Sequence, residues 1–168
     1  MLNIISVFLF VLNIFKILDL PEEPKPMPLC SLTETVWTGT YIFPCAPTST
    51  CPNTTCDHCK LFGLYLSCPG NCCIDQITFS TTDQTCFTGC GFLEIFTRPT
   101  WAPDRDGTIC TSANLVVTPV NCSNCYLCDG ETLVVKLCAS KATTLDYLAH
   151  YTCPGGTDGY ITGHIVIS

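Results

Sequence analysis

Cysteine is the residue type with the greatest capacity for chemistry in this sequence. Two clusters, Cys56-x2-Cys59 and Cys122-x2-Cys125-x2-Cys128, have the spacing that structural zinc sites use. Zinc needs the thiolate form, which is lost when the same cysteines are oxidised to disulfides. Because the rest of the sequence indicates export, we favour disulfides and expect neither a metal nor another cofactor.

The number of cysteines is large and even, with 16 among 168 residues, and all follow residue 29. This pattern is typical of oxidised extracellular proteins, and we expect every cysteine to form a disulfide. The expected disulfide cysteines are Cys30, Cys45, Cys51, Cys56, Cys59, Cys68, Cys72, Cys73, Cys86, Cys90, Cys110, Cys122, Cys125, Cys128, Cys138 and Cys153. Adjacent residues fit disulfide geometry poorly, so Cys72 and Cys73 should bond to two different cysteines and tie several strands together.

Catalytic residues are the next candidates. Asp57-His58-Cys59 places a base beside a nucleophile, but a thiol enzyme requires a free cysteine. Neither G-x-S-x-G nor H-E-x-x-H occurs in the sequence. We therefore expect no enzyme activity, and we interpret His58, His150 and His164 as ordinary polar or half-buried residues.

Two sites match the N-x-[ST] pattern for N-linked glycosylation. They are Asn53, in Asn53-Thr54-Thr55, and Asn121, in Asn121-Cys122-Ser123. Both lie in expected loops of an exported chain, and Asn53 is the better candidate because Asn121 has a cysteine within its sequon.

Charge and composition exclude some partners and favour strands. Charged residues make up 12% of the chain, the net charge is −7, and no run of Lys or Arg occurs. Such a chain lacks the basic surface that nucleic acids or anionic membranes require, so we expect no nucleic-acid partner. Thr is abundant together with Val, Ile, Phe and Tyr, which favours β-strands.

The first 20 residues resemble a secretion signal. The apolar segment Ile4–Phe15 has the length of a signal-peptide core and is short for a membrane-spanning helix of about 20 residues. No Lys or Arg precedes it and no A-x-A-like site follows, so a short uncleaved signal anchor is the main alternative, and a buried helix is a further one. The signal peptide and the anchor both export the rest of the chain, and only the anchor predicts membrane association. Residues 21–29 contain four prolines and predict an extended spacer.

The remaining chain, residues 30–168, shows strand and turn signals. We expect strands at residues 34–43, 92–97, 113–120, 132–138 and 160–167, and mild helical character only at residues 141–150. We expect turns at residues 69–71, 104–107, 129–130 and 154–156. The predicted fold is all-β, either a small disulfide-stapled β-sandwich or two small β-modules at residues 30–100 and 101–168, with little helix after the leader.

A faint internal repeat supports the two-module alternative. Cys56-x2-Cys59-x8-Cys68 is similar to Cys125-x2-Cys128-x9-Cys138, and a Thr-Cys pair follows each, at residues 85–86 and 152–153. In a chain so rich in cysteine, chance similarity is the competing explanation, and both stay open.

One family resemblance covers roughly residues 72–168. The segment Cys72–Ile77, the Thr85-Cys86 pair with Cys90, the segment Tyr151–Cys153 and the pattern Gly159-Tyr160-Ile161-x-Gly163-x-Ile165 resemble cysteine-rich secreted domains of unknown function that are expanded in nematodes, often with six cysteines. This resemblance implies secretion and a β-rich module, and it supplies no biochemical activity.

A second resemblance is to peritrophin-type chitin-binding domains. The pattern Tyr126-x-Cys128-x-Gly130-x7-Cys138 is similar to their central run, and Cys68-Pro69-Gly70 with Phe79-x6-Cys86 is similar to another of their runs. This resemblance implies sugar binding, with Tyr126 and Tyr147 as the candidate residues that stack on sugar rings.

These observations predict a secreted or cell-surface, disulfide-rich structural or interaction protein. The alternative is an extracellular carbohydrate-binding module, most plausibly for chitin. In both cases the expected partner is an extracellular protein or a glycan.

Overall fold

The fold is all-β, with antiparallel strands in two layers and disulfides that join neighbouring strands within each layer. The computed structural model describes residues 29–39, 56–83, 85–93, 101–103, 114–120 and 125–168, and no helix occurs among them. The strands are β1 (Ser31–Thr35), β2 (His58–Ser67), β3 (Cys73–Ser80), β4 (Phe87–Leu93), β5 (Trp101–Pro103), β6 (Leu115–Pro119), β7 (Leu127–Cys128), β8 (Thr132–Ala139), β9 (Thr143–Thr152) and β10 (Asp158–Ile167). The expected fold class is confirmed.

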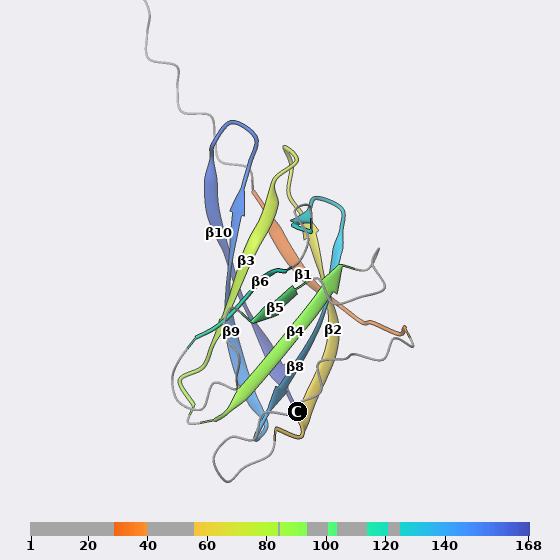
Figure 1. Ribbon diagram of the computed structural model, residues 1–168, viewed down its shortest axis with the longest axis vertical. Helices are drawn as coiled ribbons and strands as arrows, with labels where there is room; N and C mark the ends of the chain where they lie inside the picture. The colour runs from red at the N-terminus through yellow and green to blue at the C-terminus, as the bar shows by residue number, and fades with distance from the viewer. Residues whose placement is uncertain (1–28, 40–55, 84, 94–100, 104–113, 121–124) are drawn as a thin grey trace, which may run out of the picture.

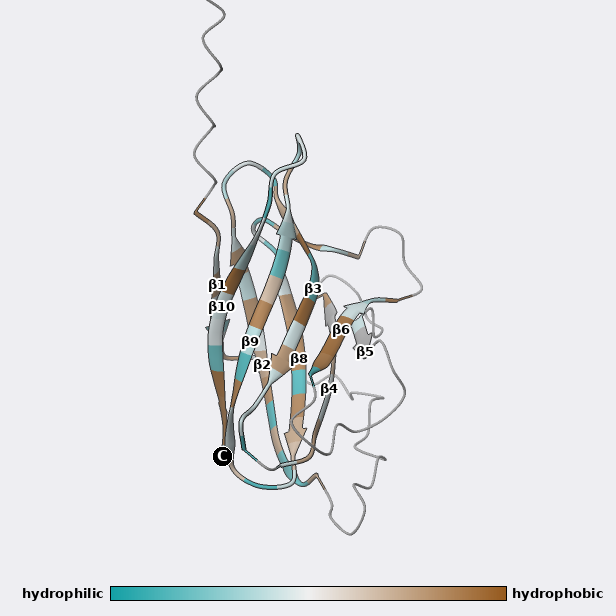
Figure 2. Cartoon of the chain, turned by 90° about the vertical axis from the view of Figure 1, so that its left-hand side faces the viewer, coloured by the Kyte–Doolittle hydropathy of each residue, from teal (hydrophilic) through white to brown (hydrophobic). Residues whose placement is uncertain are grey.

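The strands form two layers that face each other. Their hydrogen-bonded order is β1-β2-β8-β4-β5-β6-β3-β9-β10, with β7 paired to β3. The short strand β5 connects β4 to β6, and the layer β1-β2-β8-β4 packs against the layer β6-β3-β9-β10 (Figures 1 and 2). We call these the first and second layers.

Strands from the two halves of the sequence pair with one another. β2 and β4 both pair with β8, and β3 pairs with β9. Each layer therefore contains strands from residues 30–100 and from residues 101–168. These pairings build one interleaved sandwich, and the described strands do not separate into the two modules that the cysteine repeat suggested.

The helical expectation for residues 141–150 is wrong, because residues 143–150 belong to β9. Its burial alternates strictly: Leu145, Tyr147 and Ala149 are buried, whereas Thr144 and Asp146 are exposed. β9 is paired with β3 on one side and with β10 on the other. Hydrogen bonding along both edges overrides the weak helical propensity of Lys141, Leu145 and Ala149.

Several strand predictions are confirmed. The strands β6 and β8 match the expected segments, and Pro119 ends β6 as a proline in a strand should. In β10, Ile161, Ile165 and Ile167 face the core and His164 faces outward, as the alternation predicted.

Two strands begin earlier in the sequence than predicted. β1 begins at Ser31 and ends at Thr35, where its pairing with β2 ends at Gly63, so the expected strand over residues 34–43 is wrong for residues 36–39. β4 begins at Phe87, earlier than the expected start at residue 92, because it pairs with β8 from Leu133 to Ala139. The remainders of both predicted strands lie outside the described residues.

The core lies between the two layers and includes a polar anchor. The largest fully buried side chain is Trp101 of β5, with Phe62, Phe79 and Phe87 next in size. The Trp101 indole Nε1 donates a 2.7 Å hydrogen bond to the backbone carbonyl of Cys125. This hydrogen bond satisfies a polar atom that would otherwise be costly to bury, so β5 is fixed at the junction of the layers.

Two tyrosines of β9 fill space beside glycines of β10. Tyr147 lies opposite Gly163 and Tyr151 lies opposite Gly159 in the antiparallel register. A Cβ atom at Gly163 would come within 2.4 Å of the Tyr147 hydroxyl oxygen, and one at Gly159 within 2.5 Å of that of Tyr151. The rings occupy the volume that side chains on β10 would need. Any residue larger than glycine at position 159 or 163 would therefore clash with a tyrosine ring.

Several predicted features lie outside the described residues. These are the leader (residues 1–20), nearly all of the proline-rich spacer (residues 21–29), both sequons (Asn53 and Asn121), the turn at residues 104–107, and the cysteines Cys45, Cys51, Cys110 and Cys122. The other three predicted turns, at residues 69–71, 129–130 and 154–156, are confirmed.

Candidate functional site

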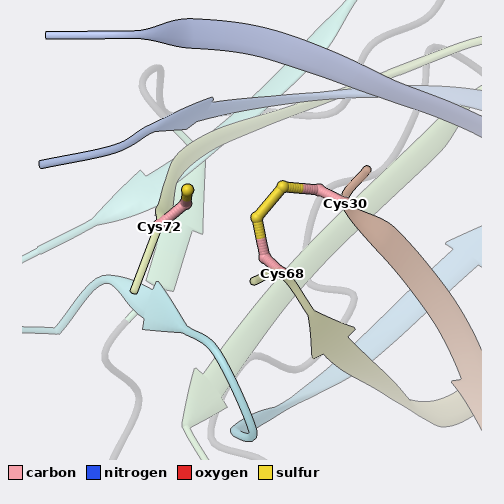
Figure 3. A group of neighbouring side chains, drawn as sticks. All are labelled: Cys30, Cys68 and Cys72. Carbon is pink, nitrogen blue, oxygen red and sulfur yellow. A yellow bond between two sulfur atoms is a disulfide. The ribbon is translucent and has the colours of Figure 1, made fainter. Parts of the chain in front are cut away.

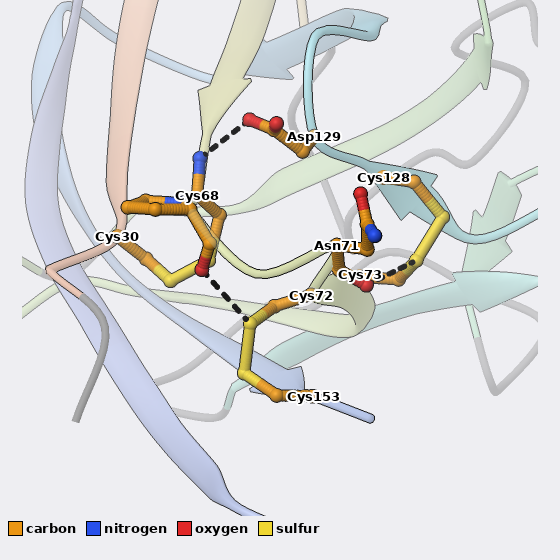
Figure 4. The surroundings of a disulfide bond; sticks show 9 residues. Cys30, Cys68, Asn71, Cys72, Cys73, Cys128, Asp129 and Cys153 are labelled. Atoms are coloured by element: carbon orange, nitrogen blue, oxygen red, sulfur yellow. Dashed lines mark hydrogen bonds between the residues drawn. A yellow bond between two sulfur atoms is a disulfide. The ribbon is translucent and has the colours of Figure 1, made fainter. Parts of the chain in front are cut away.

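Three disulfides gather at one end of the sandwich. They join Cys30 to Cys68, Cys72 to Cys153 and Cys73 to Cys128. They link the beginning of β1 to the end of β2, and the beginning of β3 to the ends of β7 and β9 (Figure 4). We call this group the disulfide cluster.

The adjacent pair Cys72-Cys73 organises the disulfide cluster. Cys72 is fully buried and bonds to Cys153, which follows β9, whereas Cys73 is half-buried and bonds to Cys128 of β7. Successive residues of an extended chain point in opposite directions, so one dipeptide can reach two neighbouring segments. The prediction that these cysteines have different partners is confirmed.

The sulfurs of Cys30, Cys68 and Cys72 lie within 4.8 Å of one another, close enough to suggest a metal site (Figure 3). All three are already in disulfides, and a disulfide sulfur does not supply the thiolate that a metal requires. This part of the described structure is therefore a structural crosslink.

The turn between β7 and β8 forms hydrogen bonds with residues of the disulfide cluster and with the end of β2. The Asp129 carboxylate accepts a 2.7 Å hydrogen bond from the backbone N–H of Cys68, and the Glu131 carboxylate accepts one from the N–H of Cys128. The N–H of Gly130, whose positive φ of 80° suits glycine, donates to the Leu66 carbonyl. The end of β2 is thus fixed by hydrogen bonds as well as by a disulfide.

The bonding of the other cysteines bears on the nucleophile and zinc-ligand roles considered from the sequence. Cys59 bonds to Cys138 across the β2–β8 pair, and Cys86, Cys90 and Cys125 are also disulfide-bonded. Because Cys59 is oxidised, it is neither a nucleophile beside His58 nor a zinc ligand, and the same holds for the zinc role of Cys128.

A group of polar side chains on the second layer surrounds His150. Its Nδ1 lies 2.7 Å from an Asp75 carboxylate oxygen, and its Nε2 lies 3.5 Å from an Asp158 carboxylate oxygen. The Tyr160 ring lies beside it, with ring centroids 5.1 Å apart and the planes tilted by 49°. We call Asp75, His150, Asp158 and Tyr160 the histidine cluster.

Three strands position the histidine cluster. Tyr160 of β10 is the direct partner of His150 on β9, and Asp158 lies two residues earlier on the same face. The register of β3 shifts between Ile74 and Gln76, so Asp75 is an extra residue opposite His150. Such a bulge redirects a side chain, and here it brings Asp75 to the imidazole.

The carboxylates change the acid–base behaviour of His150. Its hydrogen bond with Asp75 raises the pKa of His150 above the ordinary value of 6.5, partial burial opposes this shift, and Asp158 adds to the increase. Both carboxylates stabilise the imidazolium form, because each gains attraction when the ring becomes positive. The cluster therefore favours the protonated form of His150 more than water does.

The surface beside the histidine cluster is hollowed and partly apolar. An open pocket of about 460 Å³ is lined by side chains that include Thr78, Asp146, Leu148, Thr162 and His164. Large apolar side chains are exposed on this face of β9 and β10, namely Leu148, Tyr160 and Val166. We call the outward side of β3, β9 and β10 the outer face.

The structure separates the two predicted sugar-stacking tyrosines. Tyr126 is 45% exposed and directly precedes Leu127, the partner of Ile74, so it lies at the edge of the second layer. Tyr147 is only 8% exposed and its hydroxyl donates to the Leu32 carbonyl, so it cannot offer its ring to a sugar. The expectation for Tyr147 is wrong because β9 turns this side chain into the core.

Tyr160 is an accessible aromatic residue that sequence reasoning did not single out for binding. It is 61% exposed and faces outward because its neighbour Ile161 faces the core. Alternation along residues 160–167 could have identified it. The proximity of Asp75 to His150, which are 75 residues apart in sequence, has no comparable local signal.

The described residues contain no helix that is long and apolar enough to span a membrane. Comparisons with known proteins give little further guidance. No family model and no curated protein matches the chain. Among solved structures, it is similar to "BcpA*(D312A), the major pilin subunit of Bacillus cereus", with 8% sequence identity and a TM-score of 0.44. The match covers 82% of this chain and 39% of the pilin, and a likeness this distant supports no argument about function.

Proposed function

We propose that this protein acts outside the cell as a disulfide-stapled interaction module and that its partner binds the outer face of the second layer. The compartment is supported by the disulfides, which the reducing cytosol does not maintain. The signal-like leader predicted from the sequence supports the same compartment.

The observation that carries the proposal is the composition of the outer face. Most apolar side chains of β9 and β10 point into the core, yet Tyr160 and Leu148 stand exposed beside the histidine cluster. Exposed aromatic and aliphatic side chains beside hydrogen-bonding groups are typical of recognition surfaces. A rigid sheet also holds such groups in place at little entropic cost on binding.

A protein partner is our first candidate. Leu148 and Tyr160 provide apolar contact area, while Asp146, Asp158 and His164 around them provide polar contacts. This arrangement of an apolar centre with a polar rim matches the anatomy of protein interfaces.

A glycan partner is the second candidate, and one specific observation favours it. The exposed Tyr160 ring lies beside His150, which is itself held by Asp75 and Asp158. An aromatic surface next to carboxylate and imidazole groups can contact a sugar ring and hydrogen-bond its hydroxyls. Tyr126 at the edge of the same layer is a second exposed aromatic side chain.

The test compares variants of the two layers. The purified protein is assayed against immobilised chitin and other glycans, and against a display library of extracellular protein domains. We expect Tyr160→Ala with Leu148→Ala to abolish binding to the ligand found. Tyr65→Ala, which removes an exposed tyrosine from β2 in the first layer, is the matched control and should bind normally. Binding that survives the outer-face variant but is lost with the control would contradict the proposal.

A further inference from the structure

Strand β10 presents an open edge. It lies at the end of the strand order, and among the described strands only β9 pairs with it. The β9–β10 register runs without a shift from Asp158 opposite Thr152 to Ile167 opposite Thr143. The backbone N–H and C=O groups on the other side of this ten-residue strand are therefore not paired with any strand of the described part of the chain.

This edge lacks the features by which monomeric proteins protect an open strand. Such edges are usually short, bulged, or interrupted by Pro or Lys. β10 contains no Lys, Arg or Pro, and it has no bulge against β9. By contrast β1, at the opposite end of the strand order, has five residues and carries Glu34 in an ion pair with Lys60.

The sequence of β10 is also complementary to itself. With a two-fold axis at Gly163, an antiparallel second copy would place Tyr160 opposite Val166 and Ile161 opposite Ile165. Thr162 would then face His164. Every pair next to the axis combines side chains of similar polarity, which is what stabilises antiparallel strands.

A neighbouring register is less favourable. With the axis moved to Thr162, Asp158 would face Val166 and Tyr160 would face His164, so apolar groups would meet polar ones. Registers shifted by an odd number of residues place core-facing side chains on the outer face. The axis at Gly163 therefore fits the alternation of the strand best.

We propose that a second copy of this chain pairs with β10, in an antiparallel manner with the two-fold axis at Gly163, so that the two second layers form one continuous sheet. The pairing would cover Tyr160 and Val166, which are 61% and 53% exposed in the single chain. It uses the strand edge, whereas the partner site proposed above uses the outer face, and Tyr160 belongs to both. Leu148→Lys separates the two proposals, because it alters the outer-face site and leaves the strand edge intact.

The experiment measures the mass of the full exported protein over a wide concentration range by sedimentation. We expect the mass to rise from one chain toward two. The double variant Tyr160→Lys/Val166→Lys should remain a single chain. Positions 160 and 166 lie opposite each other in the paired strands, so the introduced positive charges would repel. Leu148→Lys is the matched control, since it changes an exposed apolar residue of β9 away from the edge, and it should still associate.

Hydrogen exchange on the wild-type protein tests the same pairing without a substitution. Amides of β10 should exchange more slowly at concentrations where the two-chain species forms, while those of β1 should not change. A protein that stays a single chain at every concentration overturns the proposal. So does association that persists in the double variant or leaves β10 exchange unaffected.

Discussion

The hydroxyl of Tyr147 on β9 donates a 3.3 Å hydrogen bond to the backbone carbonyl of Leu32 on β1. The two residues are 115 positions apart in sequence and belong to opposite layers of the sandwich. This contact connects the strand that begins the described fold with the strand that supports the outer face. Burial raises the pKa of Tyr147, and the nearby Glu34 carboxylate adds to the increase, so the hydroxyl stays a donor at neutral pH.

Tyr147→Phe should destabilise the protein by about 1 kcal/mol, because the buried Leu32 carbonyl would lose its side-chain donor while packing is retained. Chemical denaturation monitored by tryptophan fluorescence measures the free energy of unfolding. Tyr65→Phe, at an exposed position, is the control and should have no effect. Equal stability of Tyr147→Phe and the wild type would show that the hydrogen bond contributes nothing.

Gly163→Val should cost about 1 to 3 kcal/mol, even though valine ordinarily favours strands. Its Cβ would meet the Tyr147 ring, which has little room to move within the core. Thr162→Val places the same side chain on the exposed neighbouring residue and serves as the control in thermal unfolding experiments. If both variants are as stable as the wild type, the close approach of ring and glycine is not a constraint.

Protonation of His150 should be coupled to folding. Because its pKa is raised in the folded state, the added stability is fully present below the unfolded value of about 6.5. It is lost as the pH rises through the folded pKa. NMR titration of the ring protons should give a lower pKa in Asp75→Asn than in the wild type, since the main hydrogen bond to the imidazolium is weakened.

Asp158→Asn should lower the His150 pKa by a smaller amount, because its carboxylate is 3.5 Å from Nε2. Asp57→Asn, which lies beside His58, is the control and should leave the His150 titration unchanged. An unaltered His150 pKa in Asp75→Asn would contradict the assigned geometry.

Removal of a disulfide from the cluster should be severe. The double variant Cys72→Ala/Cys153→Ala should lose about 2 to 5 kcal/mol, a large part of the 5 to 15 kcal/mol typical of a domain. Strong reductant should unfold the wild-type protein at room temperature. Circular dichroism and the emission of the buried Trp101 report the loss of structure, and spectra unchanged by reductant would count against this prediction.

The sequence predicted those parts of the fold that depend on local pattern. Alternation in residues 132–138 and 160–167 identified β8 and β10, and glycine-containing turns at residues 69–71 and 154–156 were placed correctly. Poor geometry for a bond between neighbours was enough to predict separate partners for Cys72 and Cys73.

The parts that depend on distant contacts could not be predicted in the same way. Residues 141–150 have apolar residues compatible with a helix, and only pairing with β3 and β10 makes them a strand. The hydroxyl of Tyr147 reaches the carbonyl of Leu32 on β1, 115 residues away in sequence, and no local pattern indicates this contact. The histidine cluster depends on a one-residue bulge at Asp75 that brings together residues from three strands.

Disulfide mapping of the full-length protein tests the central claim most directly. The protein is digested without reduction, and crosslinked peptides are identified by mass spectrometry. Stepwise degradation then cleaves between Cys72 and Cys73, so that the link of each cysteine is assigned separately. The interleaved, oxidised sandwich predicts links from Cys72 to Cys153, from Cys73 to Cys128, from Cys59 to Cys138 and from Cys30 to Cys68. Links confined within residues 30–100 and within residues 101–168, or alkylation of these cysteines before reduction, would contradict the account.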